Sequence, residues 1–205
     1  MEKADQPRLT PMYEQYLKVK AEYPDALLFY RMGDFYEMFF DDAIKVSSLL
    51  DLTLTGKDCG LKERAPMCGI PFHAADTYIA KLVALGEKVA ICEQLSDPKA
   101  SKGLVDRDVI RIVSAGTLIE DTLLDETKNN YIACVSKTEE SIAAAWADIT
   151  TGEFSVAEFK GVAENALSDA VGFLLGLGVA EVICNDDMAL LSKDVKEIRP
   201  GALPP

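Results

Sequence analysis

The sequence predicts an α/β (α+β) protein in which a mixed β-sheet flanked by helices is followed by a second, smaller unit. Apolar runs of strand length alternate with segments of helical periodicity from residue 10 to residue 114, which is typical of a mostly buried sheet with helices packed on it. After residue 130 the hydrophobic pattern changes, and three short strand-like runs follow one another with turn-forming residues between them. The length of 205 residues suits one large domain or two small ones.

The clearest element signals lie in the first unit. Thr10 and Pro11 predict a helix start, because a hydroxyl cap and a proline at the first helical position both favour one, and Pro24 predicts its end. Residues 26–32, ALLFYRM, form a continuous apolar run that predicts a strand covered on both faces. The other expected elements are a helix at 37–50, a half-buried strand at 50–55, a flexible polar loop at 56–66, a helix at 75–86 and strands at 87–94 and 107–114.

An acidic stretch without periodicity separates the two units. We therefore divide the chain into a first domain at 1–115, a linker at 116–129 and a second domain at 130–205. In the second domain we expect three antiparallel strands, a helix and a strand, and then a short helix at 186–194 and a last strand at 195–200. This order is the opening of a ribonuclease H-like fold, and because no further helix follows we expect a truncated, incomplete domain.

The charge balance argues against an ordinary nucleic-acid-binding protein. The chain has 34 acidic and 21 basic side chains and a formal charge of −13, and neither residues 1–127 nor residues 128–205 carry a net positive charge. Neutralising phosphates takes clustered Lys and Arg. Any DNA binding by this chain therefore depends on a local group of residues or on other parts of a larger assembly.

The composition also excludes several other classes. No apolar run approaches the ~20 residues of a membrane span, and the N-terminal residues 1–10 hold no hydrophobic stretch, so we expect no membrane partner and no signal peptide. The cysteines form no CxxC pair, which predicts neither a zinc site nor a disulfide scaffold and fits a reducing cytoplasm. Phosphate-binding loops of the form GxxxxGK[ST] and GxSxG nucleophile motifs do not occur. We therefore expect no cofactor in this segment.

Residues 33–40, GDFYEMFF, are the strongest candidate for a functional site. Phe35 and Tyr36 lie around a turn beside the carboxylate of Glu37. One interpretation is a helix N-terminus, with Asp34 as the cap and both aromatic residues in the core. The other leaves Phe35 exposed to stack on a planar ligand such as a nucleobase, an interaction worth roughly 1–3 kcal/mol per base that needs no positive charge.

Several blocks of the sequence resemble the MutS family of DNA mismatch-repair proteins. LLFYRMGDFYEMFFDDA resembles that family's mismatch-recognition motif, and APMCGIPFHAADTYIAKLVALGEKVAICEQLSDP resembles its next block. TPMYEQYLKVK fits the N-terminal helix of the family's first domain, and DVIRIVSAGTL is similar to the end of that domain. The match is close from residue 10 to about residue 125 and looser after residue 130, where the chain is similar to the family's connector domain.

The resemblance implies a role for two residues. Phe35 would enter the minor groove and stack on a mispaired or unpaired base, and Glu37 would hydrogen-bond to the same base. The family's bacterial members are cytoplasmic, nucleoid-associated homodimers in which one subunit uses this pair on a given mismatch. The resemblance also implies downstream mismatch-repair proteins as partners of the connector. It places an ATPase domain, with ATP and Mg, beyond this segment, which by itself is expected to be no enzyme.

Such a role is compatible with an acidic chain. An apolar wedge in the minor groove unstacks and kinks a base step at a cost of a few kcal/mol, and badly paired steps cost less to deform. Selectivity can therefore come from deformability rather than from charge. We hypothesise that a protonated Glu37 donates a hydrogen bond to a base acceptor, whereas the ionised carboxylate is repelled by the phosphates of normal DNA.

Basic residues elsewhere in the chain are weaker candidates. Four of them are candidate phosphate contacts, with solvated surface charge as the alternative interpretation: Lys57, Arg64, Arg107 and Arg111. His73, the single histidine, follows an Ile-Pro-Phe run, and we expect it to cap or pack rather than to ligate a metal.

The second domain carries two rival functions. Asp148 ends a strand at a place where ribonuclease H-like nucleases keep a catalytic acid. A two-metal nuclease needs several converging carboxylates, and nothing in the sequence brings Glu158 and Asp169 to Asp148. The other rival is a protein-interaction or allosteric connector module.

Overall fold

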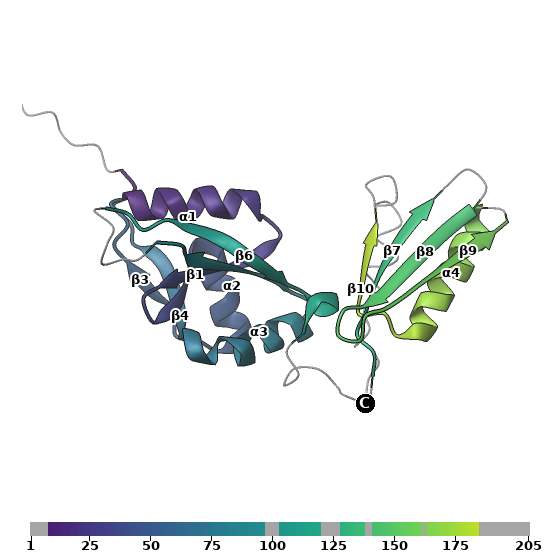
Figure 1. Ribbon diagram of the computed structural model, residues 1–205. Helices are drawn as coiled ribbons and strands as arrows, with labels where there is room; N and C mark the ends of the chain where they lie inside the picture. The colour runs from purple at the N-terminus through teal and green to yellow at the C-terminus, as the bar shows by residue number, and fades with distance from the viewer. Residues whose placement is uncertain (1–7, 97–102, 120–127, 138–140, 162, 185–205) are drawn as a thin grey trace, which may run out of the picture. The chain divides into compact units, whose positions relative to one another are not determined.

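The structure, a computed structural model, describes the chain in five stretches: residues 8–96, 103–119, 128–137, 141–161 and 163–184. Its internal contacts divide the chain into two compact units, Met1–Ser114 and Ala115–Pro205. Each unit has its own β-sheet with helix packed on it (Figure 1). The predicted α+β class with mixed sheets and flanking helices is therefore confirmed.

A six-stranded mixed sheet forms the centre of the first unit, with strand order β3-β4-β2-β1-β5-β6. The strands are β1 (Ala26–Met32), β2 (Phe35–Phe39), β3 (Thr55–Lys57), β4 (Ala65–Pro71), β5 (Lys88–Gln94) and β6 (Arg107–Val113). Strands β1 and β5 run parallel, and the other neighbouring pairs are antiparallel. The ends of β1 and β5 and the starts of β2 and β6 therefore lie at one end of the sheet.

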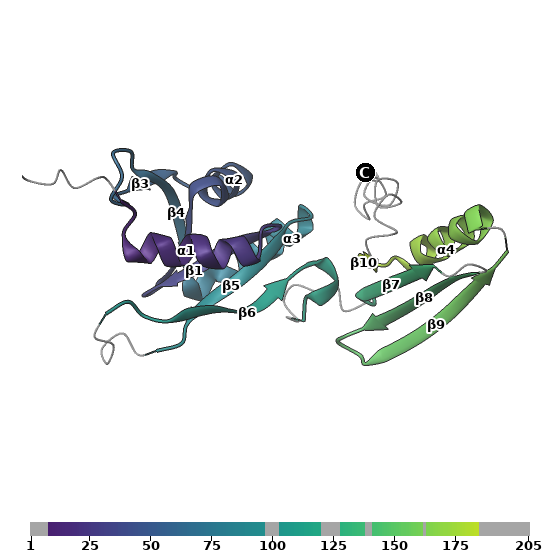
Figure 2. The ribbon, with the colours of Figure 1, turned by 90° about the horizontal axis from the view of Figure 1, so that it is seen from above.

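Helices cover both faces of this sheet. They are α1 (Pro11–Glu22), α2 (Phe40–Leu50) and α3 (Ala75–Ala84). Helix α1 lies on one face, and α2 and α3 lie on the other (Figures 1 and 2). Strand β1 is accordingly buried on both sides, with Leu28 and Tyr30 in the cluster beneath α1 and Phe29 facing the opposite way. The predicted doubly covered strand is confirmed with its bounds, and the helix starting at Pro11 is confirmed as well.

The aromatic core beneath α1 holds the start of α2 in place. Tyr13 and Tyr16 each meet the ring of Phe39 edge-on, with centroids 5.0 Å apart. Asp42, buried in the first turn of α2, pairs with Lys20 of α1 at 2.9 Å and accepts a hydrogen bond from the backbone N–H of Leu28 at 3.0 Å. A buried carboxylate needs such partners to offset its lost hydration.

The structure corrects the predictions for the segment between β1 and β4. Residues 35–39 form a strand rather than a helix start, because they pair with β1 on one side and with β4 on the other. The strand expected at 50–55 is wrong apart from Thr55, since Asp51 adopts a left-handed φ of 54° that ends α2. The loop expected at 56–66 is shorter than predicted, and strand β4 was not predicted at all.

The second unit contains a four-stranded sheet of order β10-β7-β8-β9. Its elements are β7 (Tyr131–Lys137), β8 (Ser141–Asp148), β9 (Glu153–Lys160), α4 (Ala163–Leu177) and β10 (Glu181–Cys184). The antiparallel meander, the helix and a final strand parallel to β7 follow the predicted order. The helix and strand expected at 186–194 and 195–200 lie outside the described residues. No helix in the described stretches is both long and apolar enough to cross a lipid bilayer.

Candidate nucleic-acid interface

Phe35 stands at the tip of the hairpin between β1 and β2. The register pairs Met32 with Phe35, which leaves Gly33 and Asp34 as a two-residue turn. Gly33 has a φ of 61°, as the first position of a type II′ turn requires, and glycine adopts that conformation without strain. The hairpin therefore turns as tightly as a two-residue connection allows, with Phe35 as the first residue after it.

The side chain of Phe35 is 47% exposed, unlike the other aromatic residues of the hairpin. Alternation along β2 sends Tyr36 to the opposite face, where it is buried against Phe29 at a centroid distance of 6.0 Å. Phe39, on the same face as Phe35, is buried beneath α1. Phe35 lies at the end of the sheet, paired with Pro71 on β4, and the core does not enclose it.

Glu37 shares the face of Phe35 and is paired with a cation. Its Oε2 lies 2.7 Å from the Nζ of Lys57, which comes from the edge strand β3. The two side chains are 17% and 37% exposed, so the pair is partly shielded from water. Gly69, opposite Glu37 on β4, leaves room for the carboxylate, because a Cβ there would lie 3.5 Å from Glu37 Cγ and 3.3 Å from the carbonyl oxygen of Tyr36.

The remaining basic candidates are distributed over both faces. A β-bulge in the pairing of β5 with β6 shifts the register, so that Arg107 lies on the α1 face and Arg111, opposite Ile91, lies on the other. Arg64 is exposed on the loop between β3 and β4. The structure therefore brings Phe35, Glu37, Lys57 and Arg107 to one face and places Arg111 on the opposite one.

Asp148 in the second unit serves a turn. It is 1% exposed and accepts hydrogen bonds from the N–H and hydroxyl of Thr150 at 2.8 and 2.6 Å and from the N–H of Asn130 at 3.1 Å. Burial by itself raises the pKa of Asp148, but these hydrogen bonds outweigh it and the net pKa is lowered. The register sends Glu158 to the opposite face of the sheet. Among the residues that the structure describes, no three His, Cys, Asp or Glu are grouped to hold a metal ion.

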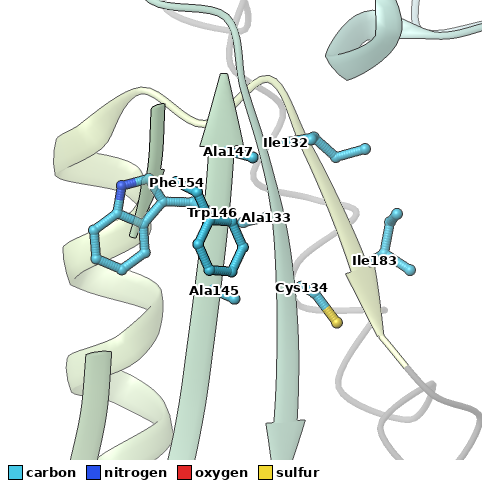
Figure 3. A pocket seen from close by; sticks show the side chains of 8 residues that line it. All are labelled: Ile132, Ala133, Cys134, Ala145, Trp146, Ala147, Phe154 and Ile183. Atoms are coloured by element: carbon cyan, nitrogen blue, oxygen red, sulfur yellow. The ribbon is translucent and has the colours of Figure 1, made fainter. Parts of the chain in front are cut away.

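The sheet of the second unit has an exposed apolar face that the sequence analysis missed. On the side away from α4, Phe154 on β9 and Ile132 and Ile183 on β7 and β10 flank the small side chains of Ala145 and Ala147 on β8, forming a shallow pocket (Figure 3). Phe154 is 68% exposed. The available signal was strand β8, SIAAAWAD, in which three of the four positions facing away from α4 are alanine, where a solvated face would carry polar residues.

Comparison with known proteins agrees with this architecture. Two family models match the chain: MutS domain I over residues 10–122 and MutS domain II over residues 130–202. Three similar proteins are each named DNA mismatch repair protein MutS. The protein of Acetivibrio thermocellus is 61% identical over 146 residues, which are 71% of this chain and 17% of that protein. Those of Ruminiclostridium cellulolyticum and Lachnoclostridium phytofermentans are 50% and 48% identical over 192 residues, covering 93% and 94% of this chain and 22% and 20% of theirs.

The two sheets and the two matched models define a member of a multidomain family, of which this chain contains the domains numbered I and II. The chain belongs to the MutS family. It spans about a fifth of the length of the curated relatives that it matches.

Proposed function

We propose that this chain senses mispaired or unpaired bases in double-stranded DNA during mismatch repair. Phe35 acts as an apolar wedge in the minor groove and stacks on the faulty base, and Glu37 hydrogen-bonds to that base. The observation that carries the proposal is the exposure of Phe35 at a hairpin tip, because the other aromatic side chains of β1 and β2 are buried. Burying a phenylalanine stabilises a fold by about 1.5–3 kcal/mol, and the fold forgoes part of that gain here.

The surroundings of Phe35 favour a deformed duplex over a normal one. Glu37 is on the same face, and only one described cation, Lys57, is paired with it. The wedge gains stacking from any base, whereas the cost of unstacking is lower at a mispaired step. The site therefore binds best where the helix is easiest to open, and the chain's negative charge weakens its hold on ordinary DNA.

We propose that this segment acts as a non-enzymatic sensor within a larger protein. ATP hydrolysis with Mg, assembly as a homodimer and the docking of downstream repair proteins are assigned to the whole protein. The nuclease alternative is disfavoured, because one oxygen atom of Asp148 accepts from the N–H and hydroxyl of Thr150 in its own turn and the other accepts from the N–H of Asn130.

A chimera tests the proposal. This chain replaces the corresponding segment of the Ruminiclostridium cellulolyticum relative, and binding to a G·T duplex is compared with binding to the matched perfect duplex by fluorescence anisotropy. The Phe35→Ala chimera is expected to lose most of its G·T preference, by about tenfold if stacking contributes 1–3 kcal/mol. Phe154→Ala, which removes an even more exposed ring from the second unit, is the control and is expected to keep the G·T preference. Equal preference in the parent and Phe35→Ala would refute the proposal.

A further inference from the structure

Side-chain contacts on the sheet face opposite Phe35 fix the position of the turn that carries it. Arg31, at the end of β1, has its Cζ 3.8 Å from the ring centre of Phe72 and 5.5 Å from that of Tyr36. Its Nη1 lies 3.4 Å from Oε1 of Glu93, and the hydroxyl of Tyr36 donates to the same oxygen. The Arg31 side chain is only 17% exposed, although the Phe72 ring that it contacts is exposed at the surface.

Both residues of the turn are held by this group. The Nε of Arg31 donates to the carbonyl oxygen of Gly33 at 2.5 Å. The backbone N–H of Phe72, whose ring stacks on Arg31, donates to the carbonyl oxygen of Asp34 at 3.0 Å. The backbone that directly precedes Phe35 is therefore anchored at two successive carbonyl groups.

A second arginine holds the same strand from the α1 face. The Nε of Arg107 donates to the carbonyl oxygen of Arg31 at 2.9 Å, and its Nη2 lies 3.5 Å from the sulfur of Met32. Its guanidinium lies over the ring of Tyr30 at 4.9 Å, and its Nη1 donates to the side-chain oxygen of Gln15 at 3.2 Å. Most of the five donors of Arg107 are thus used within the protein, which disfavours the phosphate contact expected from the sequence.

We propose that Arg31 and Arg107 form a two-sided clamp that fixes the angle at which Phe35 projects, and that both are positioning residues for mismatch sensing. The inference rests on the proposed function of Phe35. Stacking of Phe35 between bases requires the backbone of its turn to hold one conformation. If the turn is flexible in the free protein, ordering it on binding costs conformational entropy and cancels part of the free energy gained by stacking. The clamp supplies that rigidity from planar guanidinium groups, which lysine cannot replace.

The test uses the G·T preference of the same chimera in a double-mutant design. Arg31→Met and Arg107→Met are each made alone and together with Phe35→Ala. Each single variant is expected to lower the preference about fivefold, and neither is expected to lower it further once Phe35 is gone. Lys45→Met, which removes an exposed cation paired with Glu87, is the matched control.

A second readout follows the turn directly in the 205-residue chain. Hydrogen exchange of the Phe72 amide reports its bond to Asp34, and it is expected to speed up about tenfold in Arg31→Met but not in Lys45→Met. Glu93→Gln weakens the ion pair with Arg31 and alters no residue of the turn. It is expected to accelerate exchange of the Phe72 amide by a smaller factor.

The outcomes separate the two proposals. If Phe35→Ala keeps the G·T preference, the proposed function is wrong. If Phe35→Ala loses the preference while the arginine variants keep it, the function stands and the clamp is overturned. The clamp is also overturned if the arginine variants weaken G·T binding equally with and without Phe35, because that pattern indicates a general loss of structure rather than an effect through the wedge.

Discussion

The Nζ of Lys57 lies 2.7 Å from the Oε2 of Glu37, so the carboxylate that we assign to base recognition is already paired in the free protein. Lys57 comes from the edge strand of the sheet and reaches its partner past the ring of Phe39, 5.7 Å away. A cation in this position neutralises Glu37 as the face approaches a groove lined by phosphates.

Glu37→Gln is expected to keep most of the binding to a G·T duplex and to bind the perfect duplex more tightly. The amide supplies the hydrogen-bond donor that only protonated Glu37 offers, and it carries no negative charge to repel phosphates. Discrimination between the two duplexes therefore falls, because the affinity for the perfect duplex rises. Titrations of both duplexes at one ionic strength would show this rise. Loss of G·T binding in Glu37→Gln would contradict the assigned role.

Lys57→Met is expected to weaken binding to both duplexes, because it leaves Glu37 unneutralised beside the phosphates. Partly exposed ion pairs are worth about 0.2–1 kcal/mol, so a twofold to fivefold loss of affinity is expected. The loss should largely disappear in the Glu37→Gln background, since no charge then remains to neutralise. A loss of equal size in both backgrounds would mean that Lys57 acts only by contacting phosphate. The salt dependence of DNA binding by Lys57→Met would then correspond to one fewer neutralised phosphate.

Phe35→Ala and Phe39→Ala are expected to differ greatly in how much they destabilise the protein, although the two rings share a face of β2. Phe35 is 47% exposed, so its truncation should change the free energy of unfolding by no more than about 0.5 kcal/mol. Phe39 is fully buried against Tyr13 and Tyr16, and its truncation should cost about 3–5 kcal/mol. Urea denaturation followed by circular dichroism distinguishes them. A large loss in Phe35→Ala would show that the ring serves the core.

The limits of the sequence analysis follow from particular contacts. Residues 26–32 were predicted correctly because a long apolar run with both faces buried depends on local composition alone. Strand β4 was missed because Pro66, Gly69 and Pro71 are typical of loops, and only pairing with β2 makes them a strand. The start of α2 was misplaced because Phe40 has a left-handed φ of 52°, which a bulky residue rarely adopts and which its packing on Tyr13 stabilises.

The site could be predicted only in part for the same reason. Phe35 and Glu37 were named from their own motif, two residues apart on one strand. The pairing of Glu37 with Lys57 joins residues 20 positions apart on strands that are not neighbours, and the clamp joins Arg31 to Glu93 and Arg107 over longer separations. Such contacts depend on strand order and register, which periodicity does not determine.

Asp148 is expected to make the stability of the second unit depend on pH in the acid range. Because its folded-state pKa is lowered, its contribution is fully present above the ordinary carboxyl pKa of 3.8 and is lost as the pH falls through the folded value. Asp148→Asn should cost about 1–3 kcal/mol at pH 7 through its lost charge-assisted hydrogen bonds and should flatten the decline in stability as the pH falls below 3.8. The single tryptophan, Trp146, reports unfolding of this unit by its fluorescence. An unchanged pH profile in the variant would contradict this assignment.

Cysteine labelling tests whether the apolar face of the second unit is open. Cys134 is exposed on that face, whereas burial raises the pKa of Cys68 to about 11 and that of Cys92 to about 12. The thiolate is the reactive form, so iodoacetamide at pH 8 should modify Cys134 first and leave Cys68 and Cys92 unmodified until the chain unfolds. Mass spectrometry of the digested protein gives the order. If Cys134 reacts as slowly as Cys68, the expected exposure of this face in solution is contradicted.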